Sequence, residues 1–163
     1  MLDELDRIDR ALLTAISANA RASGATLAAT VGVAESTVSL RLRKLQASGV
    51  IRGYYADVDL TQLGIPLQAL IAIRLVRHAR SDIDDFRAQA PHLPGVVGLF
   101  HMAGSEDYLL HVAARDASEL RDFVLNYLTE HPAVAHTETN LIFEHASGDG
   151  WTSLAESEPA PRE

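Results

Sequence analysis

The hydrophobic pattern of this chain changes at Gly64-Ile65-Pro66. Before this point, apolar residues recur at helical spacing, as at Ile8, Leu12 and Ile16. After it, runs of strand-forming residues alternate with shorter helical patterns. A sequence of 163 residues is long enough for two compact domains. We therefore expect two domains of different class, with a hinge at Gly64-Ile65-Pro66.

Helices are expected in the first part from about Asp6, over Thr26 to Val31, and over Glu35 to Ala47. Gly32 supplies the left-handed turn that ends the second helix and leaves a tight connection to the third. This layout is that of a helix-turn-helix, with the third helix as recognition helix. A plain three-helix bundle would give the same periodicity and is the alternative at this point.

The distribution of charge favours the helix-turn-helix. Residues 1–60 hold equal numbers of basic and acidic residues, so the net charge of −8 arises entirely after residue 60. Within the neutral part, residues 33–56 gather basic side chains against one acidic residue, Glu35. A local basic stripe is compatible with a nucleic-acid partner even on an acidic protein.

The candidate DNA-binding residues lie on the predicted third helix. Short hydroxyl side chains near its start would let the helix approach base edges, and the cations after them would meet phosphates of double-stranded DNA. The stem of Arg41 is expected to lie on the buried face with Val38 and Leu42. The predicted DNA-binding set is Ser36, Thr37, Ser39, Leu40, Arg41, Arg43 and Lys44.

The second part of the chain predicts an α+β fold. Its elements follow in the order strand, helix, strand, strand, helix, strand, which is the order of a ferredoxin-like βαββαβ sandwich. The expected ranges are strand 67–76, helix 81–90, strands 96–102 and 107–114, helix 116–128 and strand 134–144. Two helices cover one face of such a sheet, and the strands are largely apolar on both sides. We therefore expect the open face to be buried against another subunit.

Few features indicate catalysis or metal binding. The chain has no cysteine, and its seven histidines show no zinc-ligand spacing, so no metal site is expected. Glu106 and Asp107 are adjacent, so on a strand their carboxylates face opposite sides and cannot act as an acid–base pair. Because no nucleophile or phosphate-binding glycine loop accompanies them, we expect neither a cofactor nor an enzyme.

Membrane association is not expected either. The longest apolar runs, such as residues 109–114, are much shorter than the roughly 20 residues that span a bilayer. The N-terminus is acidic, whereas secretory signals are basic. These features predict a cytoplasmic protein.

Ordered motifs in both parts of the chain resemble one known family. They are Leu5-Asp6-Arg7-Ile8-Asp9-Arg10, Leu27-Ala28 with Val31-Gly32-Val33, Val38 with Arg41-Leu42-Arg43-Lys44-Leu45, Gly49-Val50-Ile51-Arg52-Gly53-Tyr54, and Gly104-Ser105-Glu106-Asp107-Tyr108-Leu109-Leu110. Together, over residues 2–145, they resemble the Lrp/AsnC family of feast/famine transcriptional regulators.

The resemblance implies a homodimer that pairs through the sheet domains, with dimers assembling into tetramers or octamers. It also implies that paired recognition helices bind promoter DNA, and that a small effector, an amino acid or a related molecule, binds between sheet domains of neighbouring dimers. The sequence departs from the family at Ala34, where Ser is common, and at Ala103, where Thr is common. The first change removes a helix cap, and the second removes a hydroxyl near the expected ligand.

Within this resemblance, we expect the effector at the turn of residues 102–107. Gly104 would let backbone amides approach a ligand carboxylate, and Asp107 would supply the anion that an α-ammonium group needs. The predicted effector-binding set is Met102, Ala103, Gly104, Ser105 and Asp107, with Thr137 and Thr139 from a neighbouring chain. A plain structural turn is the alternative for Gly104 and Asp107.

The sequence thus predicts a DNA-binding regulator of amino-acid-related metabolism that responds to an amino acid. The alternative is a ligand-sensing or assembly protein whose helical domain binds a protein partner. The predicted domains are a winged-type helix-turn-helix domain over 1–53, a linker strand and hinge over 54–66, an effector-binding and oligomerisation domain over 67–145, and an acidic flexible tail over 146–163. Trp151 in this tail is expected to dock on a neighbour.

Overall fold

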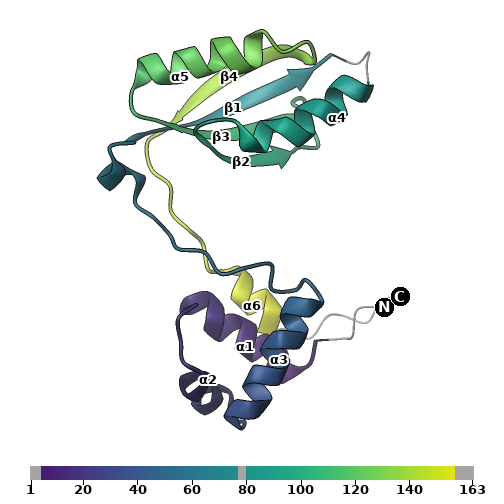
Figure 1. Ribbon diagram of the computed structural model, residues 1–163, viewed down its shortest axis with the longest axis vertical. Coiled ribbons are helices and arrows are strands. Elements are labelled where there is room, and N and C mark those ends of the chain that lie inside the picture. The colour runs from purple at the N-terminus through teal and green to yellow at the C-terminus, as the bar shows by residue number, and fades with distance from the viewer. Residues whose placement is uncertain (1–4, 77–79, 157–163) are drawn as a thin grey trace. The chain divides into compact units, whose positions relative to one another are not determined.

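The computed structural model describes the backbone of residues 5–76 and 80–156 (Figure 1). The described chain forms two compact units. The helical unit contains the residues up to Asp57 and those from Ala146 onward, and the sheet unit runs from Val58 to His145. The chain therefore leaves the helical unit once and later returns to it.

The helical unit is built from α1 (Arg7–Ala18), α2 (Gly24–Val31) and α3 (Glu35–Ala47) around one apolar core. Each helix contributes residues at helical spacing, so each turns one apolar stripe inward. The buried core residues are Leu12, Ile16, Leu27, Val38, Leu45 and Ile51. This arrangement confirms the predicted helix-turn-helix.

The beginnings of α1 and α2 are determined by polar caps. The Asp9 N–H donates to the Asp6 carboxylate at 2.8 Å, and the Asp6 N–H donates to the Asp9 carboxylate at 3.3 Å, which is a capping box. Helix α2 begins at Gly24, before the predicted Thr26, because Ser23 is the cap and accepts from the Thr26 N–H at 3.0 Å. Gly32 ends α2 at φ 72°, the predicted left-handed turn.

The predicted linker strand does not form within the described chain. Residues 54–59 form no strand, and the short 3₁₀ helix η1 (Leu60–Leu63) follows, capped by the Asp59 carboxylate. A strand requires a neighbour for its backbone hydrogen bonds, and no described strand of this chain pairs with this segment. The helical unit accordingly has no wing strand among the described residues.

The tail contains helix α6 (Trp151–Glu156), where a flexible segment was expected. Backbone and side-chain hydrogen bonds support its first turn: the Thr152 N–H donates to the Asp149 carbonyl at 3.0 Å, and the Ser153 hydroxyl donates to the Gly150 carbonyl at 2.8 Å. Helix α6 contacts α1 and is therefore part of the helical unit. The rest of the predicted tail, residues 157–163, lies outside the described residues.

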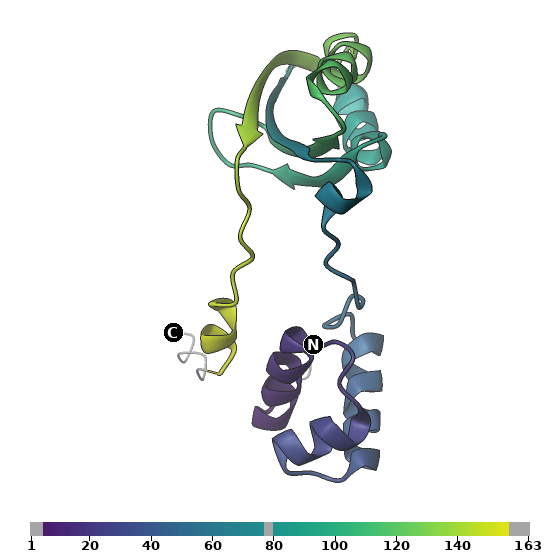
Figure 2. The ribbon, with the colours of Figure 1, turned by 90° about the vertical axis from the view of Figure 1, so that its left-hand side faces the viewer.

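The sheet unit contains β1 (Leu67–Leu75), β2 (Val96–His101), β3 (Tyr108–Ala114) and β4 (Val134–Ile142), all paired antiparallel in the order β2-β3-β1-β4. Helices α4 (Arg80–Gln89) and α5 (Ala117–Phe123) cover one face of the sheet (Figure 2). The core between the layers includes Ile71, Ile73, Phe86, Leu110 and Leu128. This is the predicted ferredoxin-like arrangement, so the α+β prediction is confirmed.

The predicted helix 116–128 is divided in two. An α-helical part, α5, passes into the π-helical segment η3 (Val124–Thr129). Asp116 caps α5 by accepting from the Glu119 N–H at 2.8 Å. The Glu119 carboxylate accepts from the Arg115 N–H at 2.6 Å instead of closing a capping box with Asp116. After Gln89, the short 3₁₀ helix η2 (Ala90–His92) ends the other helical segment.

The face of the sheet opposite the helices is apolar over only part of its width. The strand register places Leu70 and Ala72 of β1 beside His111 and Leu109 of β3, with Phe100 next to Leu109. On the other side of β1, the same face carries the exposed residues His136, Glu138 and Asn140 of β4. The expectation of an apolar open face therefore holds around Leu70, Ala72, Leu109 and Phe100, whereas Gln68 and Arg74 of β1, His111 of β3 and most of β4 make the rest of this face polar. Over residues 5–76 and 80–156, no helix combines the length and apolarity needed to cross a bilayer.

Candidate functional site

The outward face of α3 is determined by what the helix buries. Val38 and Leu45 are buried in the core, 0% and 4% exposed, and they orient the remaining side chains of α3. Of the predicted DNA-binding set, Thr37 and Arg41 are half-buried, and the others, Ser36, Ser39, Leu40, Arg43 and Lys44, are exposed. The structure thus brings small side chains at the start of the helix and free-standing cations near its end onto accessible surface.

Arg43 and Lys44 are the cations best placed to meet a ligand. The Arg43 Nε–H donates to the Ser39 carbonyl of the same helix at 3.2 Å, and both Arg43 and Lys44 are exposed. No acidic side chain among the described residues pairs with either cation. Their charge is therefore available to a polyanion.

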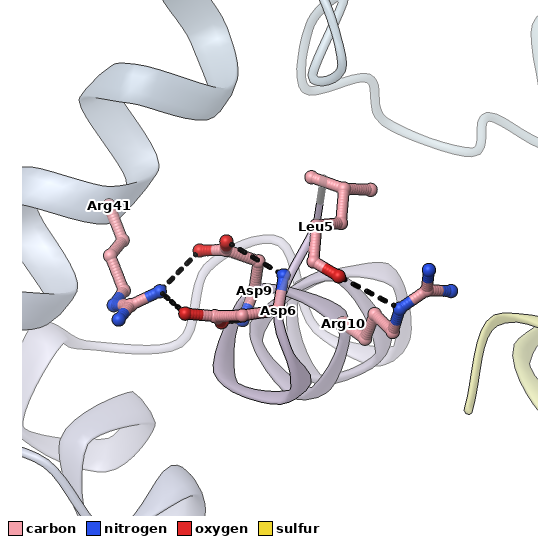
Figure 3. A network of polar contacts seen from close by, with 5 residues as sticks. All are labelled: Leu5, Asp6, Asp9, Arg10 and Arg41. Atoms are coloured by element: carbon pink, nitrogen blue, oxygen red, sulfur yellow. Dashed lines mark hydrogen bonds and ion pairs between the residues drawn. The ribbon is translucent and has the colours of Figure 1, made fainter. Parts of the chain in front are cut away.

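Arg41 is engaged differently (Figure 3). Its Nη1 donates to Asp6 Oδ2 at 2.6 Å and to Asp9 Oδ1 at 2.9 Å, and this links α3 to the capping box of α1. The Arg41 side chain is 25% exposed, and that of Asp9 is 18% exposed. The Asp9 N–H and then the Arg41 guanidinium lower the pKa of Asp6, while Asp6 and Asp9 raise the pKa of Arg41. The predicted DNA contact of Arg41 stays a prediction, and these ion pairs give the side chain an internal role as well.

Helix α3 begins without a side-chain cap. Ala34 occupies the cap position in extended conformation and makes no cap hydrogen bond, as expected from its methyl side chain. Glu35 in the first turn of α3 lies against α2, because a Cβ added at Gly24 would come 2.6 Å from Glu35 Oε1. Gly24 therefore makes room for the acidic side chain in the first turn of α3.

The predicted effector turn joins β2 to β3 and is held by Asp107. The Met102 N–H donates to the Asp107 carbonyl at 2.8 Å, and the Asp107 N–H donates to the Ile73 carbonyl at 2.9 Å. The Asp107 carboxylate accepts from the Leu75 N–H through Oδ2 at 2.7 Å. Asp107 thus ties the turn to the end of β1, while Met102, Ala103, Gly104 and Ser105 are exposed.

Thr137 and Thr139 lie on β4, across β1 from this turn. Ile73 is paired with Tyr108 on one side and with Thr137 on the other, and Thr139 faces Ile71 farther along. Thr137 is therefore at the same end of the sheet as the turn, but β1 separates the two within one chain. Their joint participation in one site is left as a prediction that involves a neighbouring chain.

A cavity of about 330 Å³ adjoins Asp107. It is lined by Leu75, Val76, Ile83, Asp84, Arg87, His101, Asp107 and Tyr108. Sequence reasoning missed Asp84 and Arg87, which are exposed on α4 and whose side chains make no ion pair among the described residues. Their i,i+3 spacing on a helix was the available signal, but only the fold shows that this helix faces Asp107.

Glu106 is a second residue that sequence reasoning set aside. Its Oε2 atom is buried and has no hydrogen-bond partner in the described structure. A buried carboxylate oxygen is costly without a donor, so this atom is a candidate for a contact supplied from outside the chain. Within residues 5–76 and 80–156, no group of three His, Asp or Glu side chains is arranged to hold a metal ion.

Comparison with known proteins matches both units. The AsnC-type helix-turn-helix domain matches residues 5–46, and the Lrp/AsnC ligand binding domain matches residues 68–151. The chain is 46% identical to the HTH-type transcriptional regulator AldR of Mycolicibacterium smegmatis over 89% of this chain and 85% of that protein. It is 30% identical to the transcriptional regulator AzlB of Bacillus subtilis over 85% of this chain and 88% of that protein.

Solved structures give the same result. The crystal structure of MtbAldR superposes with a TM-score of 0.75 at 41% identity and covers 88% of this chain and 98% of that one. The complex of a Neisseria meningitidis transcriptional regulator with L-Met superposes with a TM-score of 0.82 at 28% identity and covers 89% of this chain and 94% of that one. The chain therefore belongs to the Lrp/AsnC family of transcriptional regulators, with both the DNA-binding and the ligand-binding domain of that family, and not to a family of enzymes.

Proposed function

We propose that the chain binds promoter DNA through the outward face of α3 and that an amino acid bound to the sheet unit modulates this binding. The observation that carries the proposal is the exposed face of α3, where small side chains precede Arg43 and Lys44, two cations that form no ion pair with any described residue. Ser36 and Thr37 near the helix start are suited to base edges, and Arg43 and Lys44 to phosphates. Family membership supports the same assignment.

Salt dependence of DNA binding tests this interface. If Arg43 and Lys44 each contact a phosphate, replacing both by Ala lowers the slope of log affinity against log salt by about two. Arg121→Ala on α5 is the matched control, because Arg121 is an exposed cation of the sheet unit, and it should leave the slope unchanged. An unchanged slope in the double variant would remove α3 from DNA binding and favour a protein partner for the helical unit.

The cavity beside Asp107 suits a zwitterionic amino acid. The Arg87 guanidinium would bind the carboxylate, and the Asp84 carboxylate with the Oδ1 atom of Asp107 would receive the ammonium group. Leu75, Val76 and Ile83 supply apolar walls for an aliphatic side chain. The turn is open at Gly104, because a Cβ added there would have no atom within 4 Å apart from those of its chain neighbours. The L-Met in the similar Neisseria structure supports an amino acid as the ligand class.

Thermal unfolding in the presence of individual L-amino acids tests this site. A true effector at 100 times its dissociation constant stabilises the protein by about 2.7 kcal/mol. Asp84→Asn should abolish this shift, whereas Asp85→Asn should keep it, because Asp85 is exposed on the same helix but does not line the cavity. A wild-type protein that no amino acid stabilises would be an effector-independent regulator.

The assembly state follows from the open face of the sheet. We propose a homodimer that pairs through this face, with dimers joining into tetramers or octamers. Leu109→Arg would place a charge in the apolar part of the face and should give a monomer in sedimentation. Leu141→Arg, at a half-exposed position of β4 whose side chain lies on the other face, should keep the assembly. A Leu109 variant that assembles like wild type would contradict the proposal.

A further inference from the structure

We infer that residues 146–156 are an integral part of the helical unit, anchored by Trp151 in a groove on α1. The groove is a cavity of about 490 Å³. Its walls come from α1 and the turn after it, from the segment that follows α3, and from the tail: Leu13, Ile16, Ser17, Ala20, Val50, Ile51, Arg52, Gly53, Tyr54, Tyr55 and Trp151. The sequence expectation was that Trp151 docks on a neighbour, whereas here it lies on its own helical unit.

The chemistry of this groove fits an indole ring. Leu13 and Ile16 present apolar surface beside the core, and Trp151 is 47% exposed, so about half of a large aromatic side chain is covered. An aromatic ring that covers apolar groups removes their surface from water, while the polar edge of an indole remains hydrated at a half-exposed position. Burial of apolar surface by the indole ring therefore accounts for the contact between α6 and α1, which the acidic composition of the tail does not predict.

The anchor changes how the two units are connected. The chain passes from the helical unit to the sheet unit near residue 57 and returns near residue 146. With Trp151 docked, the free part of the second connection is confined to the residues between Ile142 and Trp151, which reach at most about 30 Å when extended. The helical unit is then tethered at both of its ends. Most of α6 lies beyond the residues that the two family domains match, 5–46 and 68–151.

The fluorescence of Trp151 tests the docking directly, because it is the only tryptophan of the chain. Ser17→Glu places a charge in the groove, and Ala18→Glu places the same charge at the next, also exposed, position of α1 that does not line it. Ser17→Glu should raise acrylamide quenching and shift the emission to the values of a synthetic peptide of residues 146–156. Ala18→Glu should behave like wild type. Wild-type quenching equal to that of the free peptide would overturn the proposal.

Mixed oligomers distinguish docking on the same chain from docking on a partner. One subunit carries Trp151→Phe with an intact groove, and the other carries Trp151 with Ser17→Glu. Docking within one chain predicts an exposed tryptophan, because the only indole then belongs to the subunit whose groove is blocked. A protected tryptophan would show docking on the partner and overturn the assignment. If the protein is monomeric in sedimentation, protected wild-type fluorescence supports docking within the chain without this experiment.

Discussion

The two candidate sites of this protein are held in place by different means. On α3, the buried side chains of Val38 and Leu45 orient the helix. The exposed side chains of the predicted DNA-binding set form no ion pair with another described element. In the turn between β2 and β3, the candidate ligand group Asp107 is itself the structural tie to β1. Substitutions at the exposed residues of α3 should therefore change DNA binding without changing stability, whereas substitutions at Asp107 should change both ligand binding and stability.

The largest expected effect comes from Asp107→Ala. Removing the carboxylate leaves the half-buried Leu75 N–H without its acceptor, and loss of a charge-assisted hydrogen bond of this kind costs about 2 kcal/mol in the free energy of unfolding. Chemical denaturation should show this loss, together with loss of any amino-acid response. Arg43→Ala on α3 should leave the unfolding free energy within about 0.5 kcal/mol of wild type. Equal free energies of unfolding for Asp107→Ala and Arg43→Ala would contradict the proposed structural difference between the two sites.

Arg41→Gln tests the one member of the α3 set that resembles Asp107. Its removal separates α3 from the two carboxylates of α1 and should cost between about 1 and 2 kcal/mol, allowing for solvent screening of these partly exposed groups. If the role of Arg41 is internal, the salt slope of DNA binding stays that of wild type.

Asp6→Asn sharpens this test because Asn caps a helix about as well as Asp but carries no charge. If Arg41 only positions α3, Asp6→Asn should weaken stability and leave DNA affinity unchanged or lower. If Arg41 instead contacts phosphate, removal of the competing carboxylate should raise DNA affinity. Affinity of the Asp6→Asn variant, measured at one fixed salt concentration, decides between these two roles.

Local signals predicted the architecture well because they are contained in short segments. Asp6 is followed by a regular apolar stripe, and the segment from Leu67 is a short, nearly continuous apolar run, so α1 and β1 lie where they are expected. The effector region was only partly predictable. The facing of α4 toward Asp107, and the tie from Asp107 to Leu75, both depend on contacts between residues distant in sequence. No local pattern distinguishes a ligand carboxylate from one that holds a turn.

The same limit explains the errors in the linker and the tail. Residues 54–59 alternate like a strand, but a strand forms only where a partner strand is present. The tail has a composition typical of disorder, but its helix α6 contacts α1, and Trp151 lines a cavity together with residues of α1. In both segments the secondary structure depends on the neighbouring elements that the segment contacts or lacks, and not on its own sequence alone.

Ala34→Ser should give a smaller effect, of opposite sign. Ala34 is already in the extended conformation of a helix cap, so a serine hydroxyl there can accept a backbone N–H of the first turn of α3. The free energy of unfolding should rise by roughly 0.5 to 1 kcal/mol in chemical denaturation. Ala47→Ser at the other end of α3 makes the same chemical change without a cap to complete and should not stabilise. Absence of any gain at position 34 would show that the start of α3 is constrained by something other than its cap.

The smallest expected effect concerns pH, and it contrasts a half-buried with an exposed histidine on the open face of the sheet. Burial, and then the charge of His145, lower the pKa of His111, whose Nε2 lies 2.8 Å from Gln68 Oε1. A lowered pKa means that the unfolded chain binds this proton at higher pH than the folded one does, so the stability of the fold decreases as pH falls through about 6.5, the ordinary histidine pKa. His111→Gln removes this titration and should make the loss of stability between pH 7 and pH 5 shallower. His136→Gln, an exposed histidine on the same face, is the control and should keep the wild-type slope. If the two variants lose stability equally steeply on acidification, the half-buried imidazole contributes no more to the pH dependence of stability than the exposed one does.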